Sequence, residues 1–125
     1  FSYDTALAHQ VEAGADVFLM PSRTEPCGLT QMYSLRYGTV PIVRATGGLV
    51  DTVEDYDPAL DDGTGFRFGP ATPAALVDAI DRALAAKQDG PRWRRLVRRG
   101  MARDFGWERS AAQYVELYER ARRLA

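Results

Sequence analysis

Two short, uninterrupted apolar runs constrain the fold of this chain more than any other feature of its sequence. The first run covers residues 17–20 and is closed by Pro21, and the second covers residues 40–43. Runs of this length between breakers are typical of parallel strands that are buried on both faces. Residues 29–37 lie between them with the length of one helix, and Gly38 is a suitable stop. We therefore expect a strand–helix–strand unit here.

The segments around this unit extend the alternation. Apolar residues recur at helical spacing over residues 3–13, and a short helical segment is expected near residues 49–53. Residues 54–62 are acidic and show no periodicity, which predicts a surface loop. Residues 65–68 alternate in polarity, as a third strand would. This order of elements predicts an α/β fold with an open parallel sheet.

The last part of the chain predicts three helices. The first follows Thr72 as N-cap with Pro73 at its first position, the second follows Pro91, and the third runs from about Trp107 to the end. The first of these helices places Leu76, Ile80 and Leu84 on one face. We divide the chain into residues 1–71, with the strand–helix units, and residues 72–125, with the C-terminal helices.

Length and charge exclude several classes of function. The chain has 125 residues, which is the size of one domain, and a net charge of −1. This charge gives no global attraction to nucleic acid or to an anionic membrane, so neither is expected as a partner. No apolar run approaches the roughly 20 residues of a membrane span. The N-terminus lacks a signal peptide and an initiator methionine, and we interpret the chain as part of a longer protein expected in the cytoplasm.

Ligands of open α/β sheets bind beyond the carboxyl ends of the strands, where two segments lie. In the first, residues 21–30, a strand leads into a helix whose first N–H groups have no internal partner and attract anions, most naturally a diphosphate. Gly28 allows close approach to the backbone, and the Glu25 carboxylate can accept hydrogen bonds from sugar hydroxyls. The alternative is that Glu25 only caps the helix and Gly28 only eases a turn.

The second segment, residues 44–51, contains the turn Thr46-Gly47-Gly48. This turn brings further backbone N–H groups to a helix start, although a Gly-Gly turn alone is more often structural.

The most specific motif of the chain is Glu25-Pro26-Cys27-Gly28-Leu29-Thr30-Gln31. This motif resembles the bacterial glycogen and starch synthases that use ADP-glucose. The resemblance continues, in order, in residues 13–16, 18–23, 36–41, 46–53, 63–66 and 104–107, with Tyr114 and Tyr118.

This resemblance implies a fold and a reaction. The fold would be the C-terminal part of the glycosyltransferase B type, in which two Rossmann-like halves, each a three-layer parallel sheet with helices, face across a cleft. The reaction would transfer glucose from ADP-glucose to the non-reducing end of an α-1,4-glucan with retention of the anomeric configuration. Neither a metal nor another cofactor is implied.

The resemblance also assigns roles to individual residues. Glu25 would be the catalytic-site carboxylate that contacts the donor glucose near its 3-OH. The backbone amides of Cys27 and Gly28 would line the sugar, and those of Leu29 and Thr30 would hold the diphosphate. Related retaining transferases carry a second acidic residue eight positions after the first, where Tyr33 stands here, which favours the glycogen synthase branch. The supporting residues would be Tyr33, Thr46, Gly47 and Gly48.

Important parts of the family site would lie upstream of Phe1. These are a Lys-x-Gly-Gly-Leu loop, a cleft histidine, and an Arg and Lys pair that neutralises the leaving diphosphate. Because such cations carry much of the leaving-group stabilisation, we predict that this chain alone is catalytically silent without the N-terminal domain.

Three further features receive structural interpretations. His9 is the only histidine and is expected to be structural, since no second ligand is at hand for a metal. Cys27 is the only cysteine, and without a base it is expected to pack rather than to react. Six arginines within residues 92–103 are interpreted as a solvated helix face that is balanced by the acidic loop.

The last helix carries an apolar stripe of Tyr114, Leu117 and Tyr118. In the family fold this helix returns toward the N-terminal domain. Without that domain, we expect the stripe to be exposed and to favour self-association or an altered helix position.

Two alternatives remain open from the sequence. One is a related retaining glycosyltransferase that prefers another nucleotide sugar, with UDP or GDP. The other is a nucleotide-binding or interaction module without catalysis.

Overall fold

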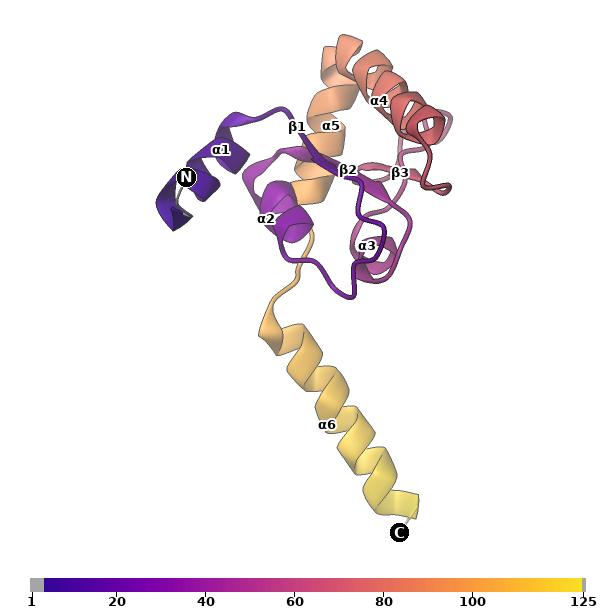
Figure 1. Ribbon diagram of the computed structural model, residues 1–125. Helices are drawn as coiled ribbons and strands as arrows, with labels where there is room; N and C mark the ends of the chain where they lie inside the picture. Colours follow the sequence, from indigo (N-terminus) through magenta and orange to yellow (C-terminus); the bar gives the residue numbers. More distant parts are fainter. Residues whose placement is uncertain (1–3, 125) are drawn as a thin grey trace.

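The computed structural model describes residues 4–124, which form a small α/β core and one long projecting helix (Figure 1). The expected helix start at Tyr3 and the last residue, Ala125, lie outside the described residues. The elements in chain order are α1 (Thr5–Gly14), β1 (Val17–Met20), α2 (Thr30–Tyr37), β2 (Val40–Arg44), α3 (Gly48–Thr52), β3 (Phe66–Phe68), α4 (Pro73–Gln88), α5 (Gly90–Met101) and α6 (Trp107–Leu124).

The three strands form one parallel sheet in the order β1-β2-β3. In its register Met20 lies beside Val43, and Arg44 lies beside Phe68. The carboxyl ends of β1 and β2 are therefore neighbours, as the sequence predicts for two consecutive parallel strands. Right-handed crossovers between such neighbours run over the same face of the sheet. Helices α2 and α3 make these two connections and are joined by a hydrogen bond from Gln31 to Thr52.

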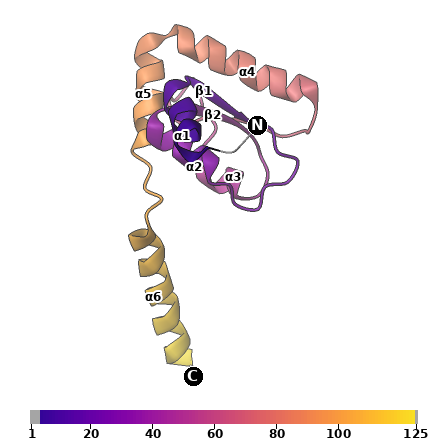
Figure 2. The ribbon, with the colours of Figure 1, turned by 60° about the vertical axis from the view of Figure 1, so that its left-hand side comes forward.

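Apolar side chains fill both faces of the sheet and give the three layers that were predicted. On one face, Ile42 and Phe66 pack with residues of α4 and α5, including Leu96. On the other face, Val43 packs with Leu49 of α3 and with its neighbours. Figure 2 shows α4 across the top of the core and α5 running down its left-hand side. Strand β2 is buried on both faces, as its continuous apolar run requires.

Helix α4 begins as predicted, and its predicted apolar face packs against the core in part. The Thr72 hydroxyl caps it by accepting a hydrogen bond from the backbone N–H of Ala75, at 3.3 Å. Leu76 and Ile80 pack against the core cluster beside the fully buried Ala79 and Ala83, whereas Leu84 is 52% exposed. The two alanines lie against the sheet because their small side chains let α4 approach β3 closely.

Two arginines of α5, and Arg103 just after this helix, form ion pairs with the acidic loop, as the interpretation of a charge-balanced helix face predicts. Arg95 bonds Asp61, at 2.6 Å, and Arg103 bonds Glu54, also at 2.6 Å. Arg99 donates through Nε to the carbonyl oxygen of Gly63, at 2.9 Å. These contacts tie residues 54–63 to α5 instead of leaving them as a free surface loop.

Helix α6 projects away from the core in both views (Figures 1 and 2). It contains no buried residue within its described length. Tyr114, Leu117 and Tyr118 are 56%, 57% and 67% exposed, so the expected exposure of the apolar stripe is confirmed. None of the helices between residues 4 and 124 is long and apolar enough to cross a membrane.

Candidate functional site

The candidate site is built from two loops at the carboxyl ends of β1 and β2. We call residues 21–29 the first loop and residues 45–47 the second loop. The first loop leads into α2, where Leu29 at the N-cap position makes no side-chain capping bond. Within the described chain, the backbone N–H groups of Thr30 and Gln31 have no hydrogen-bond acceptor. These donors carry the partial positive charge of a helix start, which suits an anion.

The two loops are interlocked through their backbones. The N–H of Gly48, the first residue of α3, donates to the carbonyl oxygens of Glu25 and Pro26, each at 3.2 Å. A Cβ atom on Gly47 would lie 1.9 Å from the Glu25 carbonyl oxygen, and one on Gly48 would lie 2.4 Å from that of Cys27. Gly47 also has a φ of +49°. The Gly-Gly turn is therefore required by close backbone contact with the first loop.

A buried glutamine supports the far end of the first loop. The Gln31 side-chain amide donates to the carbonyl oxygens of Cys27, at 3.2 Å, and Gly28, at 2.9 Å, and it also contacts the Thr52 hydroxyl. That hydroxyl donates to the Gly48 carbonyl oxygen, at 2.7 Å. The sequence analysis assigned no role to Gln31 or Thr52. The only available signal was a polar residue at the buried side of an amphipathic helix.

Glu25 lies half-buried in the first loop, at the contact with the second. The Ser22 hydroxyl donates to its carboxylate oxygen Oε2, at 3.3 Å. The carboxylate does not cap α2, because no backbone N–H of the first turn donates to it among the described contacts. The capping alternative is therefore wrong in this structure, and one carboxylate oxygen stays available for a ligand.

The other predicted site residues fall into two groups. Cys27 and Leu29 are exposed, so the expected packing role of Cys27 is wrong, and Gly28 and Thr30 are half-buried; all four lie on the first loop or the first turn of α2. Tyr33 instead lies on the side of α2 that faces α1, with its ring centroid 5.6 Å from that of His9. His9 also pairs with the Tyr37 hydroxyl, at 3.2 Å, which fits the structural role expected for it.

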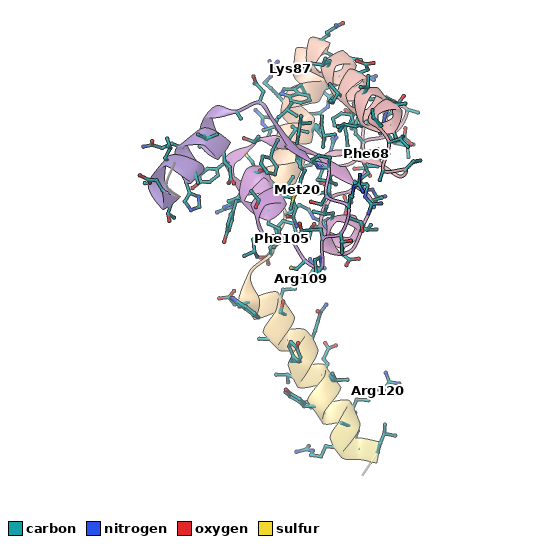
Figure 3. All side chains as sticks on the ribbon, viewed as in Figure 1. Met20, Phe68, Lys87, Phe105, Arg109 and Arg120 are labelled. Atoms are coloured by element: carbon teal, nitrogen blue, oxygen red, sulfur yellow. The ribbon has the colours of Figure 1, made fainter. Side chains whose placement is uncertain are left out.

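A cleft of about 650 Å³ opens beside the first loop. Cys27, Leu29 and Thr52 line one wall, and residues 103–107 with the first turns of α6 line the other. Figure 3 shows Phe105 on the segment that leads from the core to α6, and Arg109 at the start of that helix. Within residues 4–124, no group of three or more His, Cys, Asp or Glu side chains is arranged to hold a metal ion.

These features define an open α/β domain with a ligand site at the carboxyl ends of its strands, next to a helix N-terminus. The comparisons with known proteins give the family. The chain belongs to the glycosyl transferases group 1, whose family model matches residues 1–100. The predicted α/β glycosyltransferase B fold and the resemblance stated from the motifs are both confirmed.

Glycogen synthases are among the similar proteins. The chain is 66% identical over 116 residues to a glycogen synthase of Anaeromyxobacter sp. (strain K), a match that covers 93% of this chain and 24% of the relative. It is 56% identical over 123 residues to the glycogen synthase of Koribacter versatilis (strain Ellin345), with 98% and 25% covered. The chain thus spans about a quarter of the length of these relatives.

Two solved structures share the fold. The catalytic domain of Starch Synthase IV from Arabidopsis thaliana bound to ADP and acarbose matches with a TM-score of 0.86 and 46% identity, over 96% of this chain and 25% of that one. The sucrose-phosphate synthase from Thermosynechococcus elongatus matches with a TM-score of 0.71 and 31% identity, over 99% of this chain and 30% of that one.

Proposed function

We propose that this chain supplies the donor side of a glycogen-synthase-type glucosyltransferase. The complete enzyme would transfer glucose from ADP-glucose to the non-reducing end of an α-1,4-glucan, with retention. The observation that carries the proposal is the backbone interlock between Glu25 and Gly47–Gly48, which joins both strand-end loops into one surface beside free helix N–H groups. The similar glycogen synthases, and the similar starch synthase bound to ADP, support this substrate class.

Each part of this surface receives one part of the donor. The backbone N–H groups of Leu29 and Thr30 would bind the diphosphate, which matches the preference of a helix N-terminus for anions. The amides of Cys27 and Gly28 would line the glucose. The Glu25 carboxylate would accept a hydrogen bond from a glucose hydroxyl near the 3-position, and its bond from Ser22 would hold it in place.

The chain would bind the donor without completing the reaction. Breaking the bond between glucose and the diphosphate develops negative charge on the leaving group, which needs cations as well as N–H groups. The proposed Arg and Lys pair would lie in the N-terminal domain of the complete enzyme. This domain would also contribute to the acceptor site and to recognition of the base, and we propose a cytoplasmic enzyme.

An amide NMR titration with ADP, ADP-glucose and UDP tests donor binding. We expect shifts confined to residues 25–30 and 46–49, larger for the adenine nucleotides. Glu25→Gln should weaken binding of ADP-glucose by about tenfold and that of ADP little, because a charge-assisted hydrogen bond to the sugar is lost. The matched control is Glu119→Gln, a substitution on the exposed surface of α6. A folded spectrum that responds to none of the nucleotides would contradict a preformed donor site.

The same titration separates the alternative donors. The structural similarity to a sucrose-phosphate synthase is the reason to test a second nucleotide sugar as donor. A stronger response to UDP than to ADP would support that related transferase in place of the ADP-glucose enzyme. Binding of nucleotide with no difference between Glu25→Gln and the unchanged chain would favour a nucleotide-binding module without sugar transfer.

A further inference from the structure

Arg44, the last residue of β2, makes contacts that the sequence motifs do not explain. Its side chain is half-buried and reaches across the end of β1 to the first loop. Nε donates to the carbonyl oxygen of Ser22, at 2.7 Å, and Nη2 donates to that of Arg23. The planar guanidinium thus holds two consecutive backbone carbonyl groups, a geometry that a single ammonium group cannot reproduce.

The Arg44 guanidinium forms no ion pair with the described residues. Among residues 4–124, no carboxylate lies within 4.0 Å of this guanidinium. Arg82, Arg95 and Arg103, by contrast, each pair with an acidic side chain. Carbonyl groups offset less of the desolvation cost of a half-buried cation than a carboxylate does, so the interactions of Arg44 serve the backbone that it holds.

Different groups brace the two halves of the first loop. Gly48 and Gln31 hold the carbonyl groups of residues 25–28, which lie next to the helix N-terminus. Arg44 holds those of residues 22 and 23. Ser22 connects this second brace to the candidate site, since its hydroxyl donates to Glu25 Oε2. Arg44 therefore fixes the backbone of the residue that orients the Glu25 carboxylate.

We propose that Arg44 is a positioning residue, which sets the direction of the Glu25 carboxylate through Ser22 and so favours a nucleoside diphosphate sugar over the nucleoside diphosphate alone. The inference rests on the proposed donor site. It separates two tasks within one loop. The half braced by Gly48 and Gln31 carries the backbone N–H groups that would face the donor, and the half braced by Arg44 orients the Glu25 carboxylate toward the sugar.

The first test compares binding of ADP-glucose and ADP, by calorimetry on the 125-residue chain, for Arg44→Lys and Arg44→Gln. We expect Kd for ADP-glucose to rise about tenfold in both variants, because the Glu25 carboxylate would lose its direction and with it the charge-assisted hydrogen bond to the sugar. Kd for ADP should change less than about twofold. The matched control is Arg99→Lys, because Arg99 also donates through Nε to a backbone carbonyl group but braces the acidic loop. A similar loss of stability with unchanged binding is expected for it.

Two results would overturn the inference in this test. Equal weakening of both ligands would assign Arg44 to general loop stability. Weaker binding of ADP-glucose by Arg44→Gln, together with normal binding by Arg44→Lys, would mean that only the positive charge of Arg44 matters. A double-mutant cycle sharpens the distinction, because an effect transmitted through Glu25 should largely vanish in the Glu25→Gln background. Additive losses in the double variant would also overturn the proposal.

A second test needs no ligand and so separates this inference from the proposed function. Backbone ¹⁵N relaxation should show increased motion of residues 22–25 in Arg44→Lys, with residues 27–30 unchanged. Unchanged motion of residues 22–25 would overturn the positioning role. If the unsubstituted chain binds neither nucleotide, the proposed donor site fails by itself, and the relaxation result still decides whether Arg44 braces this half of the loop.

Discussion

Replacing Gly47 by alanine would test whether the two loops are truly interlocked. The new Cβ atom would lie 1.9 Å from the carbonyl oxygen of Glu25 and 2.9 Å from its carbonyl carbon, both closer than the 3.0 Å that real Cβ atoms respect. Both neighbours are backbone atoms, so the first loop itself must move. Gly47 also has φ +49° and ψ −138°, a conformation that side-chain-bearing residues avoid at a cost of about 1–3 kcal/mol.

Steric displacement adds to this backbone cost. Overpacking typically costs about 1–3 kcal/mol, so the two effects together predict a loss of about 2–6 kcal/mol in the free energy of unfolding. Gly48→Ala isolates the steric part, because its Cβ would approach the Cys27 carbonyl oxygen to 2.4 Å and its φ is not positive. We therefore expect a smaller loss for Gly48→Ala. Urea unfolding monitored by circular dichroism measures both.

Gly69→Ala is the control for these two variants. No heavy atom lies within 4 Å of a Cβ built at Gly69, and we expect a change within about 0.5 kcal/mol. The reasoning would be refuted if Gly47→Ala matched this control in stability and also retained the nucleotide-induced NMR shifts. Such a result would mean that the loops can separate without consequence.

Three further predictions concern pH, catalysis and assembly. The hydrogen bond from Arg95 holds the pKa of Asp61 below its ordinary value of 3.8. The ionised Asp61 therefore stabilises the fold fully above the unfolded-state pKa, and this stabilisation is lost as pH falls through the lower folded-state pKa. Urea midpoints measured downward from pH 6 should therefore fall less steeply for Asp61→Asn than for the unchanged chain. The isolated chain should show no glucose transfer from ADP-glucose to glycogen, and turnover above background would contradict the need for upstream cations. Light scattering should detect self-association that a Tyr114→Ser/Tyr118→Ser variant loses, whereas a monodisperse monomer would count against the stripe as a contact surface.

The regular elements could be predicted because their signals are local. The two apolar runs became β1 and β2 within one residue, since continuous burial on both faces leaves few other solutions for four apolar residues between breakers. Helix ends followed the same logic. Thr72 caps α4, and Gly38 ends α2, where each residue type satisfies the backbone without help from distant parts of the chain.

The contacts that shape the candidate site could not be predicted from such signals. Gly47 and Glu25 are distant in sequence and meet through backbone atoms, which no side-chain pattern records. Arg44 likewise binds carbonyl groups instead of a side chain. Along α4, helical spacing indicated the apolar face but not its fully buried positions, because close packing on the sheet selected the small side chains of Ala79 and Ala83. The sequence predicted that the Glu25 motif lies on a loop, but it did not predict the hydrogen bonds that hold the carbonyl groups of this loop.

This bracing explains how an irregular segment can present a defined surface. The first loop lacks regular secondary structure from Pro21 to Gly28, yet donors from β2, α2 and α3 hold its carbonyl groups. Its free N–H groups and its carboxylate are left for a ligand, so the fold satisfies one set of polar groups and exposes the complementary set. A substitution at Glu25 should therefore change ligand affinity at nearly constant stability, whereas one at Gly47 should change both. Comparing these two variants separates the chemistry of the site from its support.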